Sequence, residues 1–322
     1  MSATRNLNSR SLAAVVLLGA VVLLLLPHLL PPYYLGLAVQ MLVFALFAMS
    51  LDLLIGYGGM ASLGHAAYFG VAAYATGLTA LRLHWDVWLA LPAGLLAAAL
   101  TAVLFGLLAL RTRGSYFLMI TLALSQVLWG VAFGWRSLTG GDDGLPEVPR
   151  PDLGLPNLGL GPLTDSIPFY YFVLFFVTLG ALLLVRIVNS PFGHALRGIR
   201  ESETRMLALG FNVWRYKLTA FVLAGTFAGL AGCLYVYFNR FVSPDYIHVT
   251  RSAEVLLMVI LGGAGTLIGP AIGAALIVLL QNVVSGYTER WLIVIGTIYI
   301  LVALFAPDGL IGVIRRLRRR TP

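Results

Sequence analysis

The chain repeats long runs of apolar residues with almost no charge, and the length of these runs limits what it can fold into. A helix needs about 20 residues to cross a hydrocarbon core of ~30 Å. Eight runs are near that length: residues 12–30, 35–54, 63–81, 88–110, 116–133, 169–187, 218–238 and 291–306. They are apolar on all sides, as expected of helices among other helices and lipid. With 60% apolar residues, 11% charged residues and a mean hydropathy of +0.92, the sequence predicts an all-α integral membrane protein.

A further apolar region, residues 255–284, is too long for one ordinary span. It is interrupted by five residues: Gly262, Gly263, Gly265, Gly269 and Pro270. We expect two helical segments or a re-entrant pair there. Lys and Arg are retained on the cytoplasmic side, and only this arrangement keeps most of the 21 basic residues on one side with about ten crossings in all. Residues 1–322 then form a single transmembrane domain with both termini inside and a basic cytoplasmic tail at 307–322.

Several classes of activity find no support in the sequence. A phosphate-binding P-loop needs a lysine after its glycines, and the only lysine, Lys217, follows Tyr216. HExxH, GxSxG and CxxC are absent, so we predict no enzyme, no metal site and no cofactor. The net charge of +8 fits the inside bias and attraction to anionic lipid rather than nucleic acid. Cys233 lies in an apolar run and is interpreted as a small core residue.

A polar island at residues 190–217, within a predicted cytoplasmic loop at 188–217, stands out between two spans. Ser190 is placed to cap a helix with Pro191 at its first position, and Gly210 is placed to end it. Glu201 and Arg205 have the spacing of a supportive pair on such a helix. The helix either lies on lipid as an amphipathic segment or serves as a docking element for a partner.

The segment 56–70 is rich in glycine and also carries Ser62 and His65. Irregular backbone at membrane depth is tolerated only beside protein or a water-filled cavity. A second break at 262–270 lies in the other half of the chain, and paired interruptions point to a transport site. Candidate path residues are Asp52, Gly59, Ser62, His65, Thr121, Gln126, Gly263 and Gly265. All but Ser62 have a structural alternative: close helix packing for the glycines, a hydrogen-bonded structural role for His65, hydrogen bonds between helices for Thr121 and Gln126, and a solvated position for Asp52.

Residues 134–168 form the longest predicted outside loop. Its many prolines and glycines favour an ordered irregular surface over another helix. The outside cations that could meet acidic groups of a partner are Arg136, Arg150, Arg240 and Arg251.

The island and five other blocks, taken in order, carry a resemblance. The stretch SPFGHALRGIRESETRMLALGFNVWRYKLTAF resembles the cytoplasmic loop of the branched-chain amino acid permeases of ABC importers. The other blocks are residues 50–74, 110–126, 139–145 (TGGDDGL), 262–273 (GGAGTLIGPAIG) and 307–312 (PDGLIG), and together they cover nearly the whole chain beyond the first span.

This resemblance implies a permease subunit in the cell inner membrane. Its partners would be two ATP-binding cassette subunits, a related second permease or a second copy of this chain, and an external solute-binding protein. Alternating access would move the solute. The coupling residues toward the ATPase would be Arg197, Arg200, Glu201, Glu203, Arg205 and Gly210.

Two positions depart from the family pattern. The coupling signature requires a glutamate upstream of Gly210 at the position that Thr204 holds, and Glu203 is one place off. Asp52 stands where many relatives carry Asn. The resemblance favours branched-chain amino acids as solute, with urea or small carboxylates as alternatives. A self-contained ion-coupled carrier would need more ionisable groups inside the membrane than Asp52 alone.

Overall fold

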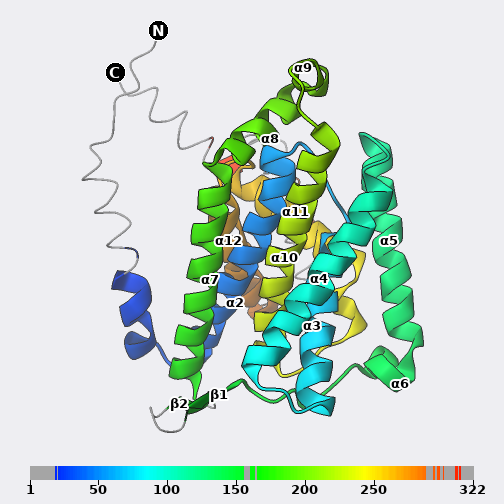
Figure 1. Ribbon diagram of the computed structural model, residues 1–322. Coiled ribbons are helices and arrows are strands. Elements are labelled where there is room, and N and C mark those ends of the chain that lie inside the picture. The colour runs from blue at the N-terminus through cyan, green and yellow to red at the C-terminus, as the bar shows by residue number, and fades with distance from the viewer. Residues whose placement is uncertain are drawn as a thin grey trace, which may run out of the picture.

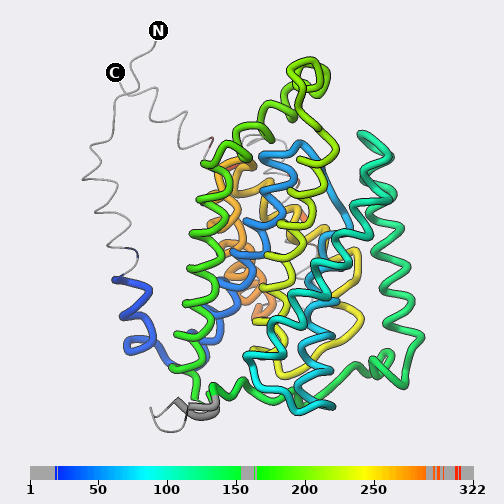
Figure 2. The backbone as a smooth tube through the Cα atoms, viewed as in Figure 1, coloured from blue at the N-terminus to red at the C-terminus, as the bar shows by residue number. Residues whose placement is uncertain are grey.

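The computed structural model describes residue 19, residues 21–155, 160–163 and 165–287, and positions 293, 296, 297, 300, 309, 310 and 312. The described part is a bundle of helices with one small β-hairpin (Figures 1 and 2). Within it, six helices are long and apolar enough to cross a membrane. The chain is therefore a multi-pass membrane protein.

Five of the predicted single spans are confirmed as long apolar helices. They are α2 (Pro32–Asp52, extended by a π-helix at Leu53–Tyr57), α4 (Val87–Ala109), α5 (Ser115–Gly134), α7 (Ser166–Val188) and α10 (Val213–Asn239). The run 63–81 forms α3 (His65–Arg82), which is helical but is not among the six long apolar helices. Residues 21–29 of the first predicted span are helical, and the run 291–306 lies almost entirely outside the described residues.

The apolar region that glycines interrupt forms two helices, α11 (Val249–Gly262) and α12 (Ile268–Tyr287). They pack closely, because a side chain at Gly262 would collide with the Gly269 carbonyl and one at Gly273 with the Met258 carbonyl. α12 is the sixth candidate span. α11 has 14 residues, which at 1.5 Å per residue is about 21 Å and shorter than the hydrocarbon core of ~30 Å.

α10 runs through the middle of the bundle between α3, α4 and α2 (Figure 1). Its contact with α4 is made by small residues: a methyl group at Gly225 would meet Ala102, and one at Gly229 would meet Ala98. Small residues let membrane helices approach closely. The resulting van der Waals contact is one of the main interactions that hold helices together in lipid. Cys233 continues this stripe; it is buried and accepts a hydrogen bond from Thr76 Oγ1 at 3.1 Å.

The polar island and the proline-rich loop lie at opposite ends of the bundle (Figure 1). The island forms α8 (Pro191–Glu201) and α9 (Glu203–Ala208). The loop contains α6 (Arg136–Thr139), a 3-10 helix at Gly141–Asp143, and the antiparallel pair β1 (Asp152–Leu155) and β2 (Leu160–Pro162). Two backbone bonds join Leu145 and Val242, and Val148 N–H donates to the Arg240 carbonyl. The loop is thus fixed to the chain that leaves α10.

The small-residue contact between α4 and α10 gives a first test. We expect Gly229→Ala to destabilise the protein by about 1–3 kcal/mol, because the added methyl overpacks against Ala98. Gly130→Ala in α5 is the matched control, because nothing lies within 4 Å of that position. Thermal melting of the purified protein in detergent would contradict the prediction if both variants melted at the parent temperature.

Candidate functional site

Three segments far apart in the sequence meet at the end of the bundle that carries α8. Asp52 is the last residue of α2, and its carboxylate accepts hydrogen bonds from two backbone N–H groups of the loop between α11 and α12. The distances are 2.6 Å from Gly265 N to Oδ1 and 3.0 Å from Leu267 N to Oδ2. Asp52 is fully buried. It therefore holds the end of α2 against the glycine break through both carboxylate oxygens.

Two arginines of α8 reach into the same place. Arg200 Nη1 donates a hydrogen bond to the Gly56 carbonyl in the π-helix. Arg197 lies over the Tyr57 ring at 4.9 Å from its centroid, and it donates to the Val188 carbonyl at 3.2 Å. Arg200 bonds to the π-helix, and Asp52, which immediately precedes this π-helix, bonds to the glycine break. Three segments are therefore connected: α8, the end of α2 and the glycine break. We call this contact the junction, and it consists of Asp52, Gly56, Arg200, Gly265 and Leu267.

Glycine is required at the junction by contact and by backbone angle. A side chain at Gly56 would collide with Asp52 and with the backbone of Gly265. Gly59 has a φ of +67° and packs against the Arg200 side chain, and Gly263 and Gly265 have φ values of +103° and +84°. Residues with a side chain rarely adopt these angles. The predicted path residues Asp52, Gly59, Gly263 and Gly265 thus lie in or beside this contact.

The island is two helices rather than the single helix predicted from its capping residues. The helix breaks at Ser202, whose backbone is extended (φ −162°, ψ 103°) and whose Oγ accepts the Arg205 N–H at 3.3 Å. Serine competes with helical backbone in this way and starts a new helix as its N-cap. The expected Glu201–Arg205 pair on one continuous helix is therefore wrong. Gly210 has a φ of +84° and follows α9.

The charged residues of the island face two ways. Arg197, Arg200 and Glu203 contact the bundle with their polar groups, although both arginines are partly open to the surface. Among the described residues, no such contact is seen for the side chains of Glu201 and Arg205, and both residues are exposed. Leu207 and Leu209 are also exposed, at 53% and 72%. The end of α8, α9 and Leu209 thus present an exposed surface that contains both charged and apolar side chains.

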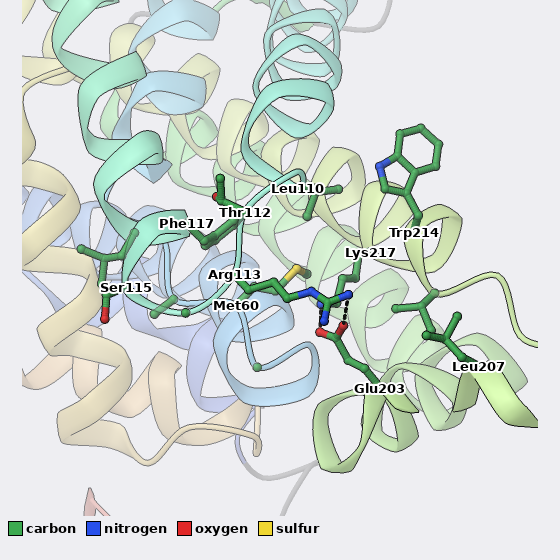
Figure 3. Close-up of a pocket in the computed structure, with 15 residues that line it drawn as sticks. Met60, Leu110, Thr112, Arg113, Ser115, Phe117, Glu203, Leu207, Trp214 and Lys217 are labelled. Carbon is green, nitrogen blue, oxygen red and sulfur yellow. Dashed lines mark hydrogen bonds and ion pairs between the residues drawn. The ribbon is translucent and has the colours of Figure 1, made fainter. Parts of the chain in front are cut away.

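Glu203 belongs to an ion-pair group beside a cavity of about 550 Å³ (Figure 3). Arg113, in the turn between α4 and α5, lies 3.6 Å from Oε2 of its carboxylate, and Lys217 of α10 pairs with Oε1. The Lys217 side chain is only 15% exposed. Apolar side chains such as Met60 and Phe117 form part of the wall. The group connects α9 to the α4–α5 turn. The sequence gives no signal for this contact, because the residues are far apart in the chain.

Three of the four remaining predicted path residues form hydrogen bonds inside the bundle. His65 is fully buried, stacks on Phe47 and has Nε2 at 2.8 Å from Ser50 Oγ. Thr121 Oγ1 accepts the Leu63 N–H at 3.3 Å, and Ser62 Oγ accepts the Gly64 N–H at 3.3 Å. The Gln126 Nε2 group is buried and has no partner among the described residues. The hydrogen bonds of His65 and Thr121 are those of the structural alternative, and no such bond is seen for Gln126 Nε2 among the described residues.

The four predicted outside cations have different surroundings. Arg136 and Arg240 are exposed at the end of the bundle opposite α8. Arg150 donates to the Leu163 carbonyl at 3.3 Å and lies over the Phe169 ring. The Arg251 guanidinium pairs with Glu254 at 2.9 Å and lies over Phe44, a residue in the middle of α2. The predicted span began at residue 255, which left both charges of this pair outside it.

Comparison with known proteins identifies the group of proteins to which this bundle is related. The family profile described as "Branched-chain amino acid transport system / permease component" matches residues 33–303. The chain belongs to this permease family. The match spans α2 to α12, and with them the junction and the ion-pair group.

Individual relatives agree with the family assignment. The chain is 30% identical over 294 residues to the high-affinity branched-chain amino acid transport system permease protein LivM of Escherichia coli K12, covering 85% of this chain and 69% of that protein. It is 26% identical to LivH of Salmonella typhimurium, covering 84% and 91%. The guanosine ABC transporter permease protein NupQ of Bacillus subtilis is 26% identical, covering 59% and 60%. No solved structure matches.

The carboxylate of Asp52 gives a second test. Asn keeps one oxygen but places an amide N–H₂ against a backbone donor, so Asp52→Asn leaves one of the two N–H groups without an acceptor. We expect a loss of about 1–3 kcal/mol of stability. Thermal melting measures this, and Asp143→Asn at an exposed loop position is the control. Equal melting temperatures for the two variants would show that the two hydrogen bonds to Asp52 do not hold the junction.

Proposed function

We propose that the chain is a membrane-spanning permease subunit of an ATP-driven ABC importer for branched-chain or related amino acids. It works by alternating access with two ATP-binding cassette subunits, a second related permease or a second copy of this chain, and an external solute-binding protein. The end that carries α8 and α9 faces the cytoplasm, both termini are cytoplasmic, and the membrane is the cell inner membrane. The family profile and the LivM and LivH relatives support this proposal.

The observation that carries the coupling role is the bond from Arg200 to the Gly56 carbonyl. An amphipathic helix that merely lies on lipid has no need of a side-chain hydrogen bond to the backbone of a neighbouring span. Through Arg200, displacement of α8 acts on the π-helix, and through Asp52 it acts on the glycine break. A rigid element that contacts two breaks in helices is suited to convert docking movements into rearrangement of the spans.

The exposed surface formed by the last residue of α8, by α9 and by Leu209 is the proposed contact with the ATPase. Glu201 and Arg205 offer charges, and Leu207 and Leu209 offer apolar area. Glu203 is proposed to connect the same segment to the bundle, because its carboxylate is already paired with Arg113 and Lys217. The residues that dock and the residues that transmit are therefore different members of the predicted coupling set.

On the opposite end, Arg136 and Arg240 are the proposed contacts with the solute-binding protein. They are exposed and lie at or beside a loop that backbone bonds hold in place. Arg150 is assigned a supporting role, since it contacts Leu163 and Phe169 of the same region. Loop residues held by a rigid scaffold are well suited to recognise a partner.

The solute is tested by uptake into vesicles that contain the assembled importer and its binding protein. We expect ATP-dependent uptake of labelled leucine, isoleucine or valine, because the LivM and LivH relatives carry these solutes by name. Parallel assays use urea, a small carboxylate and guanosine, the last because of NupQ. Uptake of guanosine alone would replace the amino acid assignment with a nucleoside one. Uptake by the chain without ATPase subunits would favour the ion-coupled carrier.

The coupling role is tested at Arg200. Arg200→Gln removes the charged donor to Gly56, so we expect ATPase association to persist while the solute moved per ATP hydrolysed falls at least tenfold, the size of a lost charge-assisted bond. Arg215→Gln is the matched control, since Arg215 is an exposed arginine near the start of α10. Transport by Arg200→Gln at the parental ratio of solute to ATP would exclude α8 from coupling.

A further inference from the structure

Two opposite charges lie inside the bundle on α11. Arg251 Nη1 is 2.9 Å from Glu254 Oε2, and the other Glu254 oxygen accepts a hydrogen bond from Gln281 Nε2 of α12. The Arg251 guanidinium also lies 5.9 Å from the centroid of the Phe44 ring. We call Arg251, Glu254 and Gln281 the midplane cluster. None of the three belongs to the junction or to the cavity beside Glu203.

The depth of the cluster follows from the helices that it touches. Phe44 lies 12 residues after the start and 13 residues before the end of the span Pro32–Tyr57. Gln281 lies 13 residues into the 20-residue helix α12. At 1.5 Å per residue, both positions are about 18–20 Å from the ends of these helices that lie nearest α8. Because both helices are candidate membrane spans, the cluster is expected within the hydrocarbon core.

The exposure of the cluster decides what it can face. The Arg251 side chain is 32% exposed and that of Glu254 is 13% exposed. An ion pair presented to hydrocarbon at this depth is costly, and charges in membrane helices almost always face a protein interior or a water-filled cavity. The open side of the cluster is thus expected to face water or protein rather than lipid.

We propose that the midplane cluster binds the α-ammonium and α-carboxylate groups of the solute during transport, with Arg251 holding the carboxylate and Glu254 the ammonium. This inference rests on the proposed function and assigns the solute a place within it. The planar guanidinium suits a carboxylate, and an ion pair of this kind can exchange its internal contact for two contacts to a zwitterion. A simple anion would leave Glu254 unpaired beside a second negative charge, so the cluster fits a zwitterion better.

The backbone around the cluster supports the same assignment. α11 begins at Val249, two residues before Arg251, and it follows an irregular segment and the 3-10 helix Pro244–Tyr246. Helix N-termini inside the membrane carry partial positive charge, which favours a solute carboxylate. His248 Nδ1 accepts only one of the first N–H groups, that of Thr250.

Binding is tested on the purified permease and ATPase complex without the solute-binding protein. Calorimetric titration uses leucine, 4-methylpentanoate, which lacks the ammonium, and 3-methylbutylamine, which lacks the carboxylate. Arg251→Gln should weaken leucine and 4-methylpentanoate at least tenfold but not the amine, and Glu254→Gln should weaken leucine and the amine but not the acid. Arg215→Gln, which removes an exposed cation near the start of α10, should bind all three as the parent does. A purely structural ion pair would instead weaken all three ligands equally in both variants, or none of them, and either result overturns the proposal.

A second measurement does not depend on removing the charges. Thr250 is exposed at the start of α11, so Thr250→Cys in a Cys233→Ala background places one thiol beside the cluster. We expect a charged thiosulfonate reagent to modify this thiol in the assembled complex and leucine to slow the reaction severalfold. Modification by a lipid-soluble maleimide alone would place this face in lipid, and no modification by either reagent would place it in a dry protein interface. Both outcomes overturn the proposal.

The two hypotheses can fail separately. Leucine uptake by the complete importer, with ligand binding that ignores Arg251 and Glu254, would leave the importer assignment standing and remove the site. Absence of amino acid uptake by the parent complex would remove the proposed function itself.

Discussion

The need to satisfy every backbone N–H and C=O group away from water governs this structure. A continuous helix does so by itself, but α2, α3, α11 and α12 are separated by irregular segments within the bundle. Side chains from distant helices fill the gaps. Asp52 accepts the Gly265 and Leu267 N–H groups, and Ser252 Oγ accepts the Ala66 N–H at 2.9 Å. Ser125 Oγ donates to the Ile247 carbonyl at 3.0 Å. Most buried hydroxyl and carboxylate groups named above can be understood as replacements for missing helical bonds.

The same interruptions bring functional groups to two depths. At the end that carries α8, the junction joins the island to the ends of α2 and α11. Further along the bundle, the first turns of α11 carry the Arg251–Glu254 pair, which a continuous hydrophobic helix would not contain. The two sites share α11, which touches the junction through the loop after Gly262 and carries Arg251 and Glu254 near its start. A shift of this one short helix would therefore be felt at both places.

The spans and both glycine breaks could be predicted from the sequence, because apolar length and interrupting residues are local signals. The break at Ser202 could not. Ser190, Pro191 and Gly210 correctly predict the outer ends of the island, but they give no signal for the capping bond at Ser202 between them. The partners of Glu203 come from segments on either side of it in the chain, and no spacing rule connects them. Arg251 precedes residue 255, where the predicted apolar region begins, so its position in the sequence predicts an outside cation. The hydrogen bond from Gln281 to Glu254, the partner of Arg251, joins two helices and could not be predicted, because it depends on tertiary packing.

The π-helix at Leu53–Tyr57 has a consequence for variation in chain length. A π-helix is an α-helix that accommodates one extra residue. An insertion or deletion in the regular α-helix before it would instead turn all that follows by about 100°. Gly56 would then leave Arg200, and the segment that brings Leu63 to Thr121 would emerge on another side of the helix. The number of residues between the start of α2 and Gly56 therefore sets the rotational register of the chain that follows, and insertions or deletions in the α-helical part of this span should be tolerated far less than in the proline-rich loop.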